Sequence, residues 1–587
     1  MEKKGKSTFD YQILLRILRL AKPYKKVFAI ASILAIVLAP VASLRPYLIN
    51  RMVDDYIIEF DLDGLLLMTG ILFGLLILEV FMRYGFLYST NLLGQSVIKD
   101  IRTTIFKHII SLKLRYFDRT PIGTLTTRTI NDIESINTVF SQGVITIVAD
   151  VLGLIAVLIV MFFSSWQLTV ICLTTMPLMI LATYVFKEKV KAAFQKVRNQ
   201  IARMNAFLQE RISGMQIVQI FNSQERELEK FKKINRDYTQ ANLDSILYYA
   251  IFFPVVDIIA AASLGLMVWW GARGVIAEEI TFGALVAFPI YLNMLFRPLR
   301  FIADKFNTLQ MGLVAADRVF RVIDSSEQIE NQGSIKPLKL EGKIEFKNVS
   351  FAYDNINYVL EDINFTINPG ETLAIVGSTG SGKTTIINIL NRFYEIHKGE
   401  ILIDGTDIKS YELNALRERN SIVLQDVFLF AGSILENITL RDETISPDKV
   451  FHSAKLIGAH EFIERMPNGY QFAVNERGSN LSMGQRQIIS FIRALVFDPD
   501  ILILDEATSS VDTETEAIIQ YAIEKLIDKR TSIIIAHRLS TIRHANYIAV
   551  MSKGRIVEYG THESLLSIDD GHYRKLYEMQ FMEASID

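Results

Sequence analysis

One stretch decides the fold: Gly377-Ser378-Thr379-Gly380-Ser381-Gly382-Lys383-Thr384. It fits the phosphate-binding P-loop pattern, in which two glycines enclose four residues and Lys and Thr follow. An apolar run at 372–376 predicts a buried strand before it, and 386–393 predicts a helix after it, which disfavours the alternative of an ordinary glycine-rich turn. Glycines let backbone N–H groups converge on phosphate oxygens, and the helix N-terminus adds positive potential. We therefore expect a nucleotide site, in which Lys383 reaches the β- and γ-phosphates and Thr384 holds Mg²⁺.

Length and composition set limits on the rest of the chain. With 587 residues it is too long for one ordinary domain, and its 50% hydrophobic residues direct attention to membrane spans. The net charge of −2 provides no basic field, so nucleic acid is not expected as a partner. The single cysteine, Cys172, excludes an internal disulfide.

Six apolar runs in the first half predict membrane-spanning helices. Each is close to the ~20 residues needed to cross ~30 Å of hydrocarbon, and the first is expected to break at Pro40. The alternative, buried helices of a large soluble core, is disfavoured by six runs in series with little polar alternation. The runs are 27–44, 65–88, 144–163, 168–186, 246–270 and 282–299.

The connections between the runs predict the topology. The connection at 50–64 is acidic, and those at 164–166 and 271–280 are short, whereas 91–140 and 187–245 are long and rich in Lys and Arg. The positive-inside rule places both long loops, the N-terminus and the following domain in the cytoplasm of a multi-pass protein of the cell (plasma or inner) membrane. Apolar residues at roughly helical spacing indicate that each long loop forms two helical extensions joined by a turn, near 121–123 and 213–214.

Several charged residues lie inside or near the predicted spans. Each costs ~2.5–3.5 kcal/mol at a helix centre, so we expect them to face the bundle interior or a wet cavity. One hypothesis is that they contact a polar or cationic substrate. The alternative is that they pair between helices or extend to the membrane surface. These residues are Glu79, Arg83, Asp150, Asp257, Arg297 and Arg300.

The pattern changes after the last span. A polar linker at 324–341 is followed by an α/β pattern from 342 to 587. Together with an N-terminal cytoplasmic segment at 1–26 and a six-span region at 27–323, this predicts a multidomain chain. Its fold class is an all-α six-helix transmembrane domain followed by an α/β P-loop NTPase domain.

A second motif completes the predicted catalytic site. The apolar strand 501–504 ends in two carboxylates, Asp505 and Glu506, as expected of the Walker B motif after a P-loop. Asp505 is expected to order Mg²⁺, and Glu506 to orient or deprotonate the water that attacks the γ-phosphate. The alternative is a core strand that happens to end in acids.

Four further positions are candidates because of their place in the pattern. Ser482 is a plausible N-cap of a helix, and a helix start is a natural anion site. Gln425 and His537 each close a predicted strand, at 421–424 and 532–536. Tyr353 follows the strand 343–351 and is a candidate to stack on adenine, although most tyrosines simply pack.

The order of these motifs resembles that of the ATP-binding cassette (ABC) family. The P-loop, Gln425, Leu-Ser-Met-Gly-Gln at 481–485, Leu504-Asp505-Glu506 and His537 follow one another as in that family, and six preceding spans look like an exporter-type half-transporter. Residues 351–353, 476–478 and 509–512 look like its adenine loop, the segment before its signature and its D-loop. Two further segments, 116–123 and 213–218, look like its coupling loops.

The resemblance implies a mechanism and a class of function. Two nucleotide domains close over two ATPs, Ser482 contacts ATP held by the partner, Gln425 senses Mg²⁺ and the attacking water, and His537 binds the γ-phosphate. The coupling loops then switch the spans from inward- to outward-facing, which implies export of amphipathic drugs or lipids across the bilayer. The alternative is a membrane-tethered ATPase that regulates or gates without pumping, and an importer or a soluble DNA-repair ATPase is disfavoured. The remaining implied nucleotide contacts are Thr385, Gly484, Gln485 and Asp512.

One position departs from the family pattern. The usual signature is Leu-Ser-Gly-Gly-Gln, and here Met483 replaces the first glycine. Its side chain is expected to crowd the approach to phosphate, because glycine permits the closest backbone contact. This favours a heterodimer with a different half-transporter chain over a homodimer.

Overall fold

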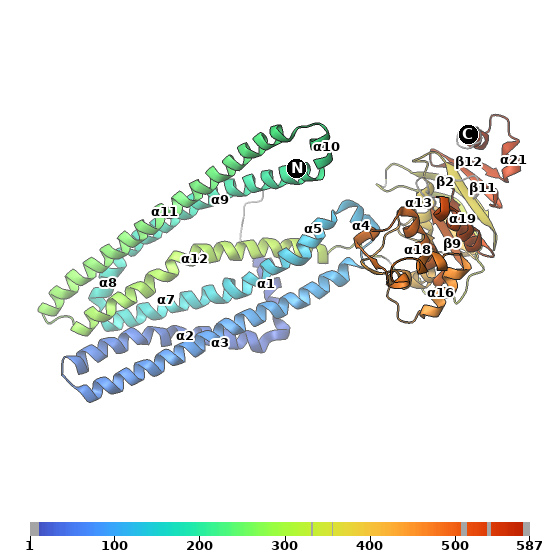
Figure 1. Cartoon of the computed structure of the whole chain (residues 1–587). Coiled ribbons are helices and arrows are strands. Elements are labelled where there is room, and N and C mark those ends of the chain that lie inside the picture. The colour runs from blue at the N-terminus through green and yellow to red at the C-terminus, as the bar shows by residue number, and fades with distance from the viewer. Residues whose placement is uncertain are drawn as a thin grey trace. The chain divides into compact units, whose positions relative to one another are not determined.

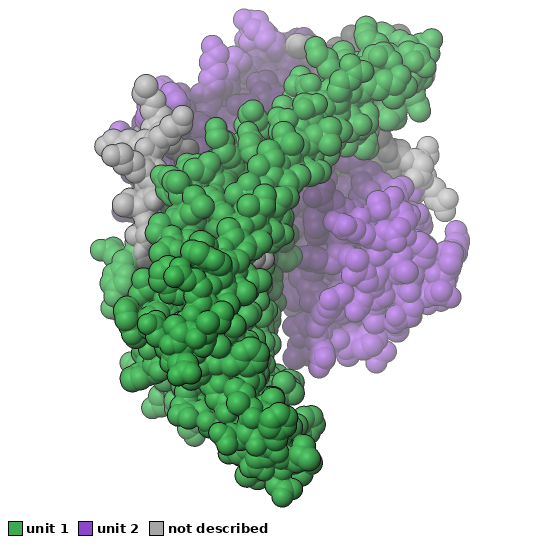
Figure 2. All heavy atoms as spheres, turned by 90° about the vertical axis from the view of Figure 1, so that its left-hand side faces the viewer, with its two compact units in different colours: residues 1–110, 121–326 green, residues 111–120, 327–587 purple. Residues whose placement is uncertain are grey.

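The computed structural model describes residues 11–329, 331, 333–354, 356–505, 513–536 and 542–578. The chain divides into two compact units, coloured in Figure 2. Unit 1 comprises residues 1–110 and 121–326, and unit 2 comprises residues 111–120 and 327–587. A ten-residue segment of the first long loop therefore belongs to the same unit as the C-terminal half.

Unit 1 is built from helices, several of them very long (Figure 1). Helices α9 and α11 run side by side, as do α2 and α3. Short π-helical turns at Val53–Ile57, Arg128–Asp132 and Val139–Gly143 extend or join neighbouring helices. The helices are α1 (Tyr11–Leu20), α2 (Lys25–Met52), α3 (Leu62–Ile109), α5 (Ile122–Thr127), α6 (Ile133–Thr138), α7 (Val144–Ser164), α8 (Trp166–Thr174), α9 (Met176–Ser213), α10 (Met215–Ile220), α11 (Gln224–Ile276) and α12 (Phe282–Ile323).

Five helical segments in the described part of the chain are long and apolar enough to cross a membrane. They contain the first five predicted runs. The sixth run lies in α12, whose apolar part among the described residues is Phe282–Pro298. The five segments are Lys22–Ile57, Leu62–Ile109, Ile122–Ser164, Trp166–Ser213 and Gln224–Ile276.

The predicted break at Pro40 is wrong. Helix α2 continues through Pro40 and Pro46 as far as Met52. Proline is tolerated in membrane helices because neighbouring helices and local adjustments compensate for the lost backbone bond. Helix α2 packs along α3 and α7, which supply such neighbours.

Two of the charged residues within the spans pair between helices. Asp150 on α7 forms an ion pair with Lys305 on α12, and Arg45 on α2 lies 3.4 Å from Glu79 on α3. Pairing of this kind is the structural alternative to substrate contact, and it reduces the cost of burying each charge. Asp257 also has an interaction partner.

Polar contacts join α2, α7 and α12 at one end of unit 1. The Asn50 side chain donates to Ser164 Oγ at 2.7 Å, and the Gly283 backbone N–H donates to Asp54 Oδ1 at 2.6 Å. A Cβ at Gly283 would lie 2.2 Å from the Asn50 carbonyl oxygen, so α2 and α12 approach as closely as backbone allows. This end is formed by the acidic connection after α2 and by two short connections.

Unit 2 contains a six-stranded sheet, a four-stranded antiparallel sheet and a two-stranded pair. The six-stranded order is β12-β11-β3-β10-β9-β6, parallel except for β12. Its strands are β3 (Thr372–Gly377), β6 (Asn420–Val423), β9 (Ile501–Asp505), β10 (Thr531–Ile535), β11 (Tyr547–Ser552) and β12 (Arg555–Gly560). The four-stranded order is β2-β1-β4-β5, with β1 (Ile344–Phe351), β2 (Leu360–Ile367), β4 (Lys398–Ile403) and β5 (Thr406–Asp407), and the pair is β7 (Gly432–Ser433) with β8 (Ala473–Val474).

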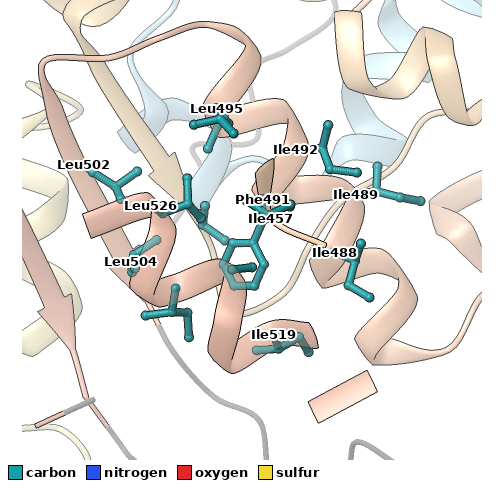
Figure 3. Close-up of a cluster of buried hydrophobic side chains, with 14 of the residues drawn as sticks. Ile457, Ile488, Ile489, Phe491, Ile492, Leu495, Leu502, Leu504, Ile519 and Leu526 are labelled. Carbon is teal, nitrogen blue, oxygen red and sulfur yellow. The ribbon is translucent and has the colours of Figure 1, made fainter. Parts of the chain in front are cut away.

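The parallel strands of unit 2 are buried on both faces. Leu373 and Ile375 of β3 belong to a core shared with the antiparallel sheet and α13, whereas Ala374 and Val376 belong to a second core. In Figure 3, side chains of α18 gather with Leu502 and Leu504 of β9 in that second core. Continuous apolar runs are typical of strands covered on both sides.

Helices cover the sheets of unit 2, and the predicted fold class of an α-helical transmembrane domain followed by an α/β domain is confirmed. The helices are α4 (Leu114–Arg119), α13 (Lys383–Leu390), α14 (Leu413–Arg419), α15 (Ile434–Thr439), α16 (Pro447–Leu456), α17 (His460–Glu464), α18 (Met483–Val496), α19 (Thr513–Ile527), α21 (His562–Leu566) and α22 (His572–Tyr577).

Candidate nucleotide-binding site

The P-loop joins the end of β3 to the start of α13. Gly382 is the N-cap of α13 and has a left-handed backbone, with φ of 101°. A Cβ there would lie 2.7 Å from Leu360 Cδ2, and one at Gly377 would lie 2.3 Å from the Met551 carbonyl oxygen. These two glycines are required because the loop passes too close to its neighbours for any side chain.

Lys383 is held inside the loop. Its side chain is nearly buried, with 8% exposure, and its Nζ donates to the carbonyl oxygens of Gly377 at 2.7 Å and Ser378 at 3.1 Å. Burial lowers the pKa of Lys383, and the nearby Asp505 opposes that shift. The loop thus holds the ammonium group in place, in a position where the group can also bind an anion.

Ser381 provides a test of whether the loop fits phosphate. Its hydroxyl oxygen is buried and has no hydrogen-bond partner among the described residues. Buried polar groups without partners are rare and call for an explanation. A phosphate oxygen in the loop would supply the missing partner, so the residues present fit a bound nucleotide.

Asp505 lies at the end of β9 with 6% exposure. Burial raises the pKa of its carboxyl group, while the charge of Lys383 and a hydrogen bond with Thr384 lower it. The structure therefore brings together Lys383, Thr384 and Asp505, as predicted from two separate motifs. A hydroxyl and a carboxylate are hard oxygen donors of the kind that Mg²⁺ takes together with substrate phosphates.

Asp426 is a neighbour of this cluster that sequence reasoning missed. It raises the pKa of Asp505 by charge repulsion. The signal was available, because Asp426 follows Gln425 just after β6, and β6 is the parallel partner of β9. The carboxyl ends of parallel neighbours meet at one edge of the sheet. Gln425 itself is exposed at this edge.

Tyr353 lies against the first turns of α13. Its hydroxyl forms a hydrogen bond with Thr385 Oγ1 at 3.2 Å and accepts one from Asn388 at 3.3 Å. Its ring meets that of Phe351 edge to face, with centroids 4.8 Å apart. The aromatic candidate and the P-loop helix are thus in direct contact.

Ser482 is the N-cap of α18, as predicted. Its Oγ accepts from the Gln485 N–H at 3.2 Å, and its own N–H donates to Gln485 Oε1 at 2.9 Å, which together form a capping box. The helix begins at Met483, directly after this cap. Gly484 is buried, while Ser482 is exposed.

Three predicted site residues lie outside the described residues. They are Glu506, Asp512 and His537. Their described neighbours in sequence lie at adjacent parallel strands of the six-stranded sheet, because Asp505 ends β9 and Ala536 directly follows β10.

Comparison with protein families decides the assignment. The family described as ABC transporter transmembrane region matches residues 28–299, and the family described as ABC transporter matches residues 360–509. The chain belongs to the ABC transporter family. The second match includes the P-loop and the end of β9. The residues described above, Lys383, Thr384 and Asp505, therefore lie in the part of this ABC transporter that matches the ATP-binding family.

Similar proteins cover almost the whole ABC transporter chain. The uncharacterized ABC transporter ATP-binding protein YknV of Bacillus subtilis is 38% identical over 579 residues, 98% of this chain and 96% of the relative. The probable multidrug resistance ABC transporter ATP-binding/permease protein YheH of Bacillus subtilis is 37% identical over 546 residues, 91% of this chain and 80% of the relative. The ATP-dependent lipid A-core flippase of Syntrophus aciditrophicus is 35% identical over 575 residues, 98% of this chain and 95% of the relative.

These findings define the general activity. This ABC transporter is a membrane protein that couples ATP hydrolysis to transport, and it is an ATP-driven exporter.

Proposed function

We propose that this transporter moves amphipathic drugs, lipids or similar substrates out of the cytoplasm or the inner leaflet by alternating access. The observation that carries the proposal is the cluster of Lys383, Thr384 and Asp505 on the same polypeptide as the membrane helices. Relatives named as a multidrug resistance transporter and a lipid A-core flippase support this range of substrates.

Each residue of the site has a proposed task. The N–H groups of 377–385 and the Lys383 ammonium bind the phosphates, and the Ser381 hydroxyl gains its missing partner there. Thr384, Gln425 and Asp505 hold Mg²⁺, which when bound neutralises charge on the phosphate oxygens. Glu506 orients the attacking water and takes its proton, His537 binds the γ-phosphate, and Tyr353 stacks on adenine.

A second half-transporter chain is needed for a complete site. Ser482 is exposed at the start of α18, where its hydroxyl can meet ATP bound to a partner, together with Gly484, Gln485 and Asp512. ATP that binds the closed pair better than the open one shifts the equilibrium toward closure by that difference in affinity.

A heterodimer is the favoured form of this pair. The supporting feature is Met483 in the signature. Met483 lies in helical backbone and is not among the residues with positive φ. Its effect on the partner's phosphate approach therefore comes from side-chain volume rather than from the backbone conformation.

The proposed location is the cell (plasma or inner) membrane, with the ATP-binding unit in the cytoplasm. The support is the excess of Lys and Arg in the loops at 91–140 and 187–245 and the acidic connection at 50–64.

Reconstitution tests the proposal. The protein is placed in vesicles with a fluorescent lipid or a hydrophobic dye, and ATP is added on the side of unit 2. Export predicts ATP-dependent accumulation against a gradient, whereas movement only down the gradient would indicate a gate. The Glu506→Gln variant is expected to bind ATP but to hydrolyse it ~10²–10⁴-fold more slowly, since it lacks the base. Turnover above about a tenth of the wild-type rate would exclude Glu506 from that role.

A further inference from the structure

The three tryptophans of the chain lie at one end of unit 1. Trp166 is the first residue of α8, and Trp269 and Trp270 lie near the end of α11. Helices α8 and α12 pack against α11, and the three helices meet at this end (Figure 1). The three residues are 63%, 57% and 47% exposed, so the protein leaves a large part of each ring uncovered.

Arg273 lies one helical turn after the two neighbouring tryptophans. Its Cζ is 5.7 Å from the Trp269 ring centroid and 6.0 Å from that of Trp270, within the ~6 Å reach of a cation–π contact. The two rings are 6.0 Å apart and meet at 72°. The guanidinium group is therefore positioned by two aromatic rings at once.

The opposite face of α11 holds this group in a fixed orientation. Gly271 is buried, and a Cβ there would lie 2.6 Å from Leu285 Cδ1 and 3.2 Å from Leu168 Cδ2. This face of α11 therefore packs closely on α8 and α12. Positions 269 and 273 lie about 160° around the helix from position 271, so Trp269 and Arg273 face away from the protein interior.

Arg273 has no anionic partner among the residues that the structure describes. It is exposed, and its side chain forms no ion pair or hydrogen bond with any of them. Arg51, at the same end of unit 1, is 3.4 Å from Asp55. An arginine that rests on aromatic rings keeps its N–H donors free, and their fork matches two oxygens of a phosphate.

The place of Arg273 along α11 corresponds to the level of the lipid headgroups. The apolar run 246–270 ends with the two tryptophans, and Arg273 follows three residues later, ~4.5 Å further along the helix axis. Tryptophan is enriched where hydrocarbon meets the headgroups, and arginine near a helix end extends to the same level. The phosphate of a lipid is the anionic group that a cation meets there.

We propose that Trp269, Trp270 and Arg273 bind the phosphate group of a membrane lipid, with a preference for anionic phospholipids, in the leaflet at this end of the spans. The two rings hold the guanidinium group, and its N–H groups donate to the phosphate oxygens. A bound lipid fixes the depth of the end of α11 in the bilayer. Binding of this kind requires neither nucleotide nor transport, and it goes beyond the proposed function.

Tryptophan quenching in lipid nanodiscs tests the site, because all three tryptophans of the full-length protein lie at this end. Nanodiscs of phosphatidylcholine receive increasing fractions of a lipid with brominated acyl chains, either anionic phosphatidylglycerol or zwitterionic phosphatidylcholine. Bromine quenches tryptophan only at contact, so the two curves give the relative affinity of the two lipids beside the rings. Arg273→Gln removes the cation, and Arg19→Gln is the matched control, because it removes the same charge from an exposed position on α1.

In the wild type, phosphatidylglycerol is expected to be preferred at least about fivefold, the factor that one cation provides at an anionic lipid surface. Arg273→Gln should lose most of this preference, while quenching by brominated phosphatidylcholine stays unchanged and shows that the end of α11 remains in place. Arg19→Gln should match the wild type. Trp166→Phe should keep the preference, since the two rings beside Arg273 remain as reporters.

Three outcomes would overturn the proposal. The first is equal quenching of the wild type by the two brominated lipids. The second is a wild-type preference in Arg273→Gln. The third is a full preference in the double variant Trp269→Phe with Trp270→Phe, in which only Trp166 reports, because the anionic lipid would then surround this end of unit 1 without a site at Arg273.

Discussion

The strand β9 and the helix α3 are both rich in apolar residues, but these residues are removed from water in different ways. All five residues of β9 are buried, and its four apolar side chains lie in two cores on opposite faces of the sheet. None of the most apolar 18-residue window of α3 is buried within the protein, and Phe81 on this helix is 69% exposed. The strand is covered by protein, whereas this window of α3 is not, and lipid is the cover expected for it. The two segments have a similarly apolar composition. Only the length of the apolar run distinguishes a strand buried in protein from a helix long enough to span a membrane.

The largest effect on activity is expected for a substitution at the edge of the unit 2 sheet that carries the P-loop. Lys383→Ala removes the cation that faces the phosphates, and ATP hydrolysis is expected to fall ~10²–10³-fold. The exposed Lys409→Ala in the same unit is the control and should leave the rate within about twofold, since surface substitutions have small effects. Phosphate release from full-length protein in detergent measures both, and equal rates would remove Lys383 from the site.

Truncation of an apolar side chain should lower the free energy of unfolding more where protein surrounds the side chain than where lipid does. Leu502→Ala in β9 should cost about 2–5 kcal/mol of unfolding free energy, because it leaves a cavity in a close-packed core. Phe81→Ala on α3 should cost less than about 1 kcal/mol, since lipid chains fill the space it leaves.

The two units can be monitored separately in that experiment. All three tryptophans, Trp166, Trp269 and Trp270, lie in unit 1, so their fluorescence reports on that unit. Binding of a fluorescent ATP analogue reports on unit 2. A Phe81→Ala variant as unstable as Leu502→Ala would show that α3 is covered by protein after all.

Much of this contrast was predictable from the sequence, and the exceptions have a common cause. The P-loop, the strand that ends at Asp505 and the N-cap at Ser482 are local patterns, in which each residue acts on neighbours within a few positions. The pairs Asp150–Lys305 and Asp118–Tyr394 join residues 155 and 276 positions apart, and no local pattern encodes them. The break expected at Pro40 failed for the same reason, because the neighbours that support the helix there come from α3 and α7.

A smaller effect on stability than that of Leu502→Ala is expected for Asp505→Asn, and this substitution acts in opposite directions on stability and activity. The folded-state pKa of this carboxyl group is raised above its unfolded value, because burial penalises the charged form. The folded chain therefore binds a proton more tightly than the unfolded chain, and stability is lost as pH rises through this range. Asp505→Asn should raise the melting temperature of nucleotide-free protein at pH 7.5 while it abolishes Mg²⁺-dependent hydrolysis. At pH values below the unfolded pKa the gain in melting temperature should vanish, and a variant that melts lower than the wild type at pH 7.5 would contradict the argument.

The smallest effect is expected at the ion pair between α7 and α12. Both side chains are partly exposed, at 28% and 29%, so breaking the pair by Asp150→Asn should cost only about 1 kcal/mol. The double variant Asp150→Asn with Lys305→Met should recover most of this loss, because no charge is left unpaired. Tryptophan fluorescence during denaturation measures the cycle. Loss of transport with unchanged stability would favour the substrate-contact role of Asp150.

The contact between Asp54 and Gly283 restricts how α2 and α12 can separate. The Gly283 N–H belongs to the first turn of α12 and has no acceptor within its own helix, so a carboxylate from another helix caps it. If the two helices part, this donor and the Asp54 carboxylate both need new partners, and hydrocarbon chains offer none. A gap between these helices is therefore stable only when water enters it and supplies the missing partners.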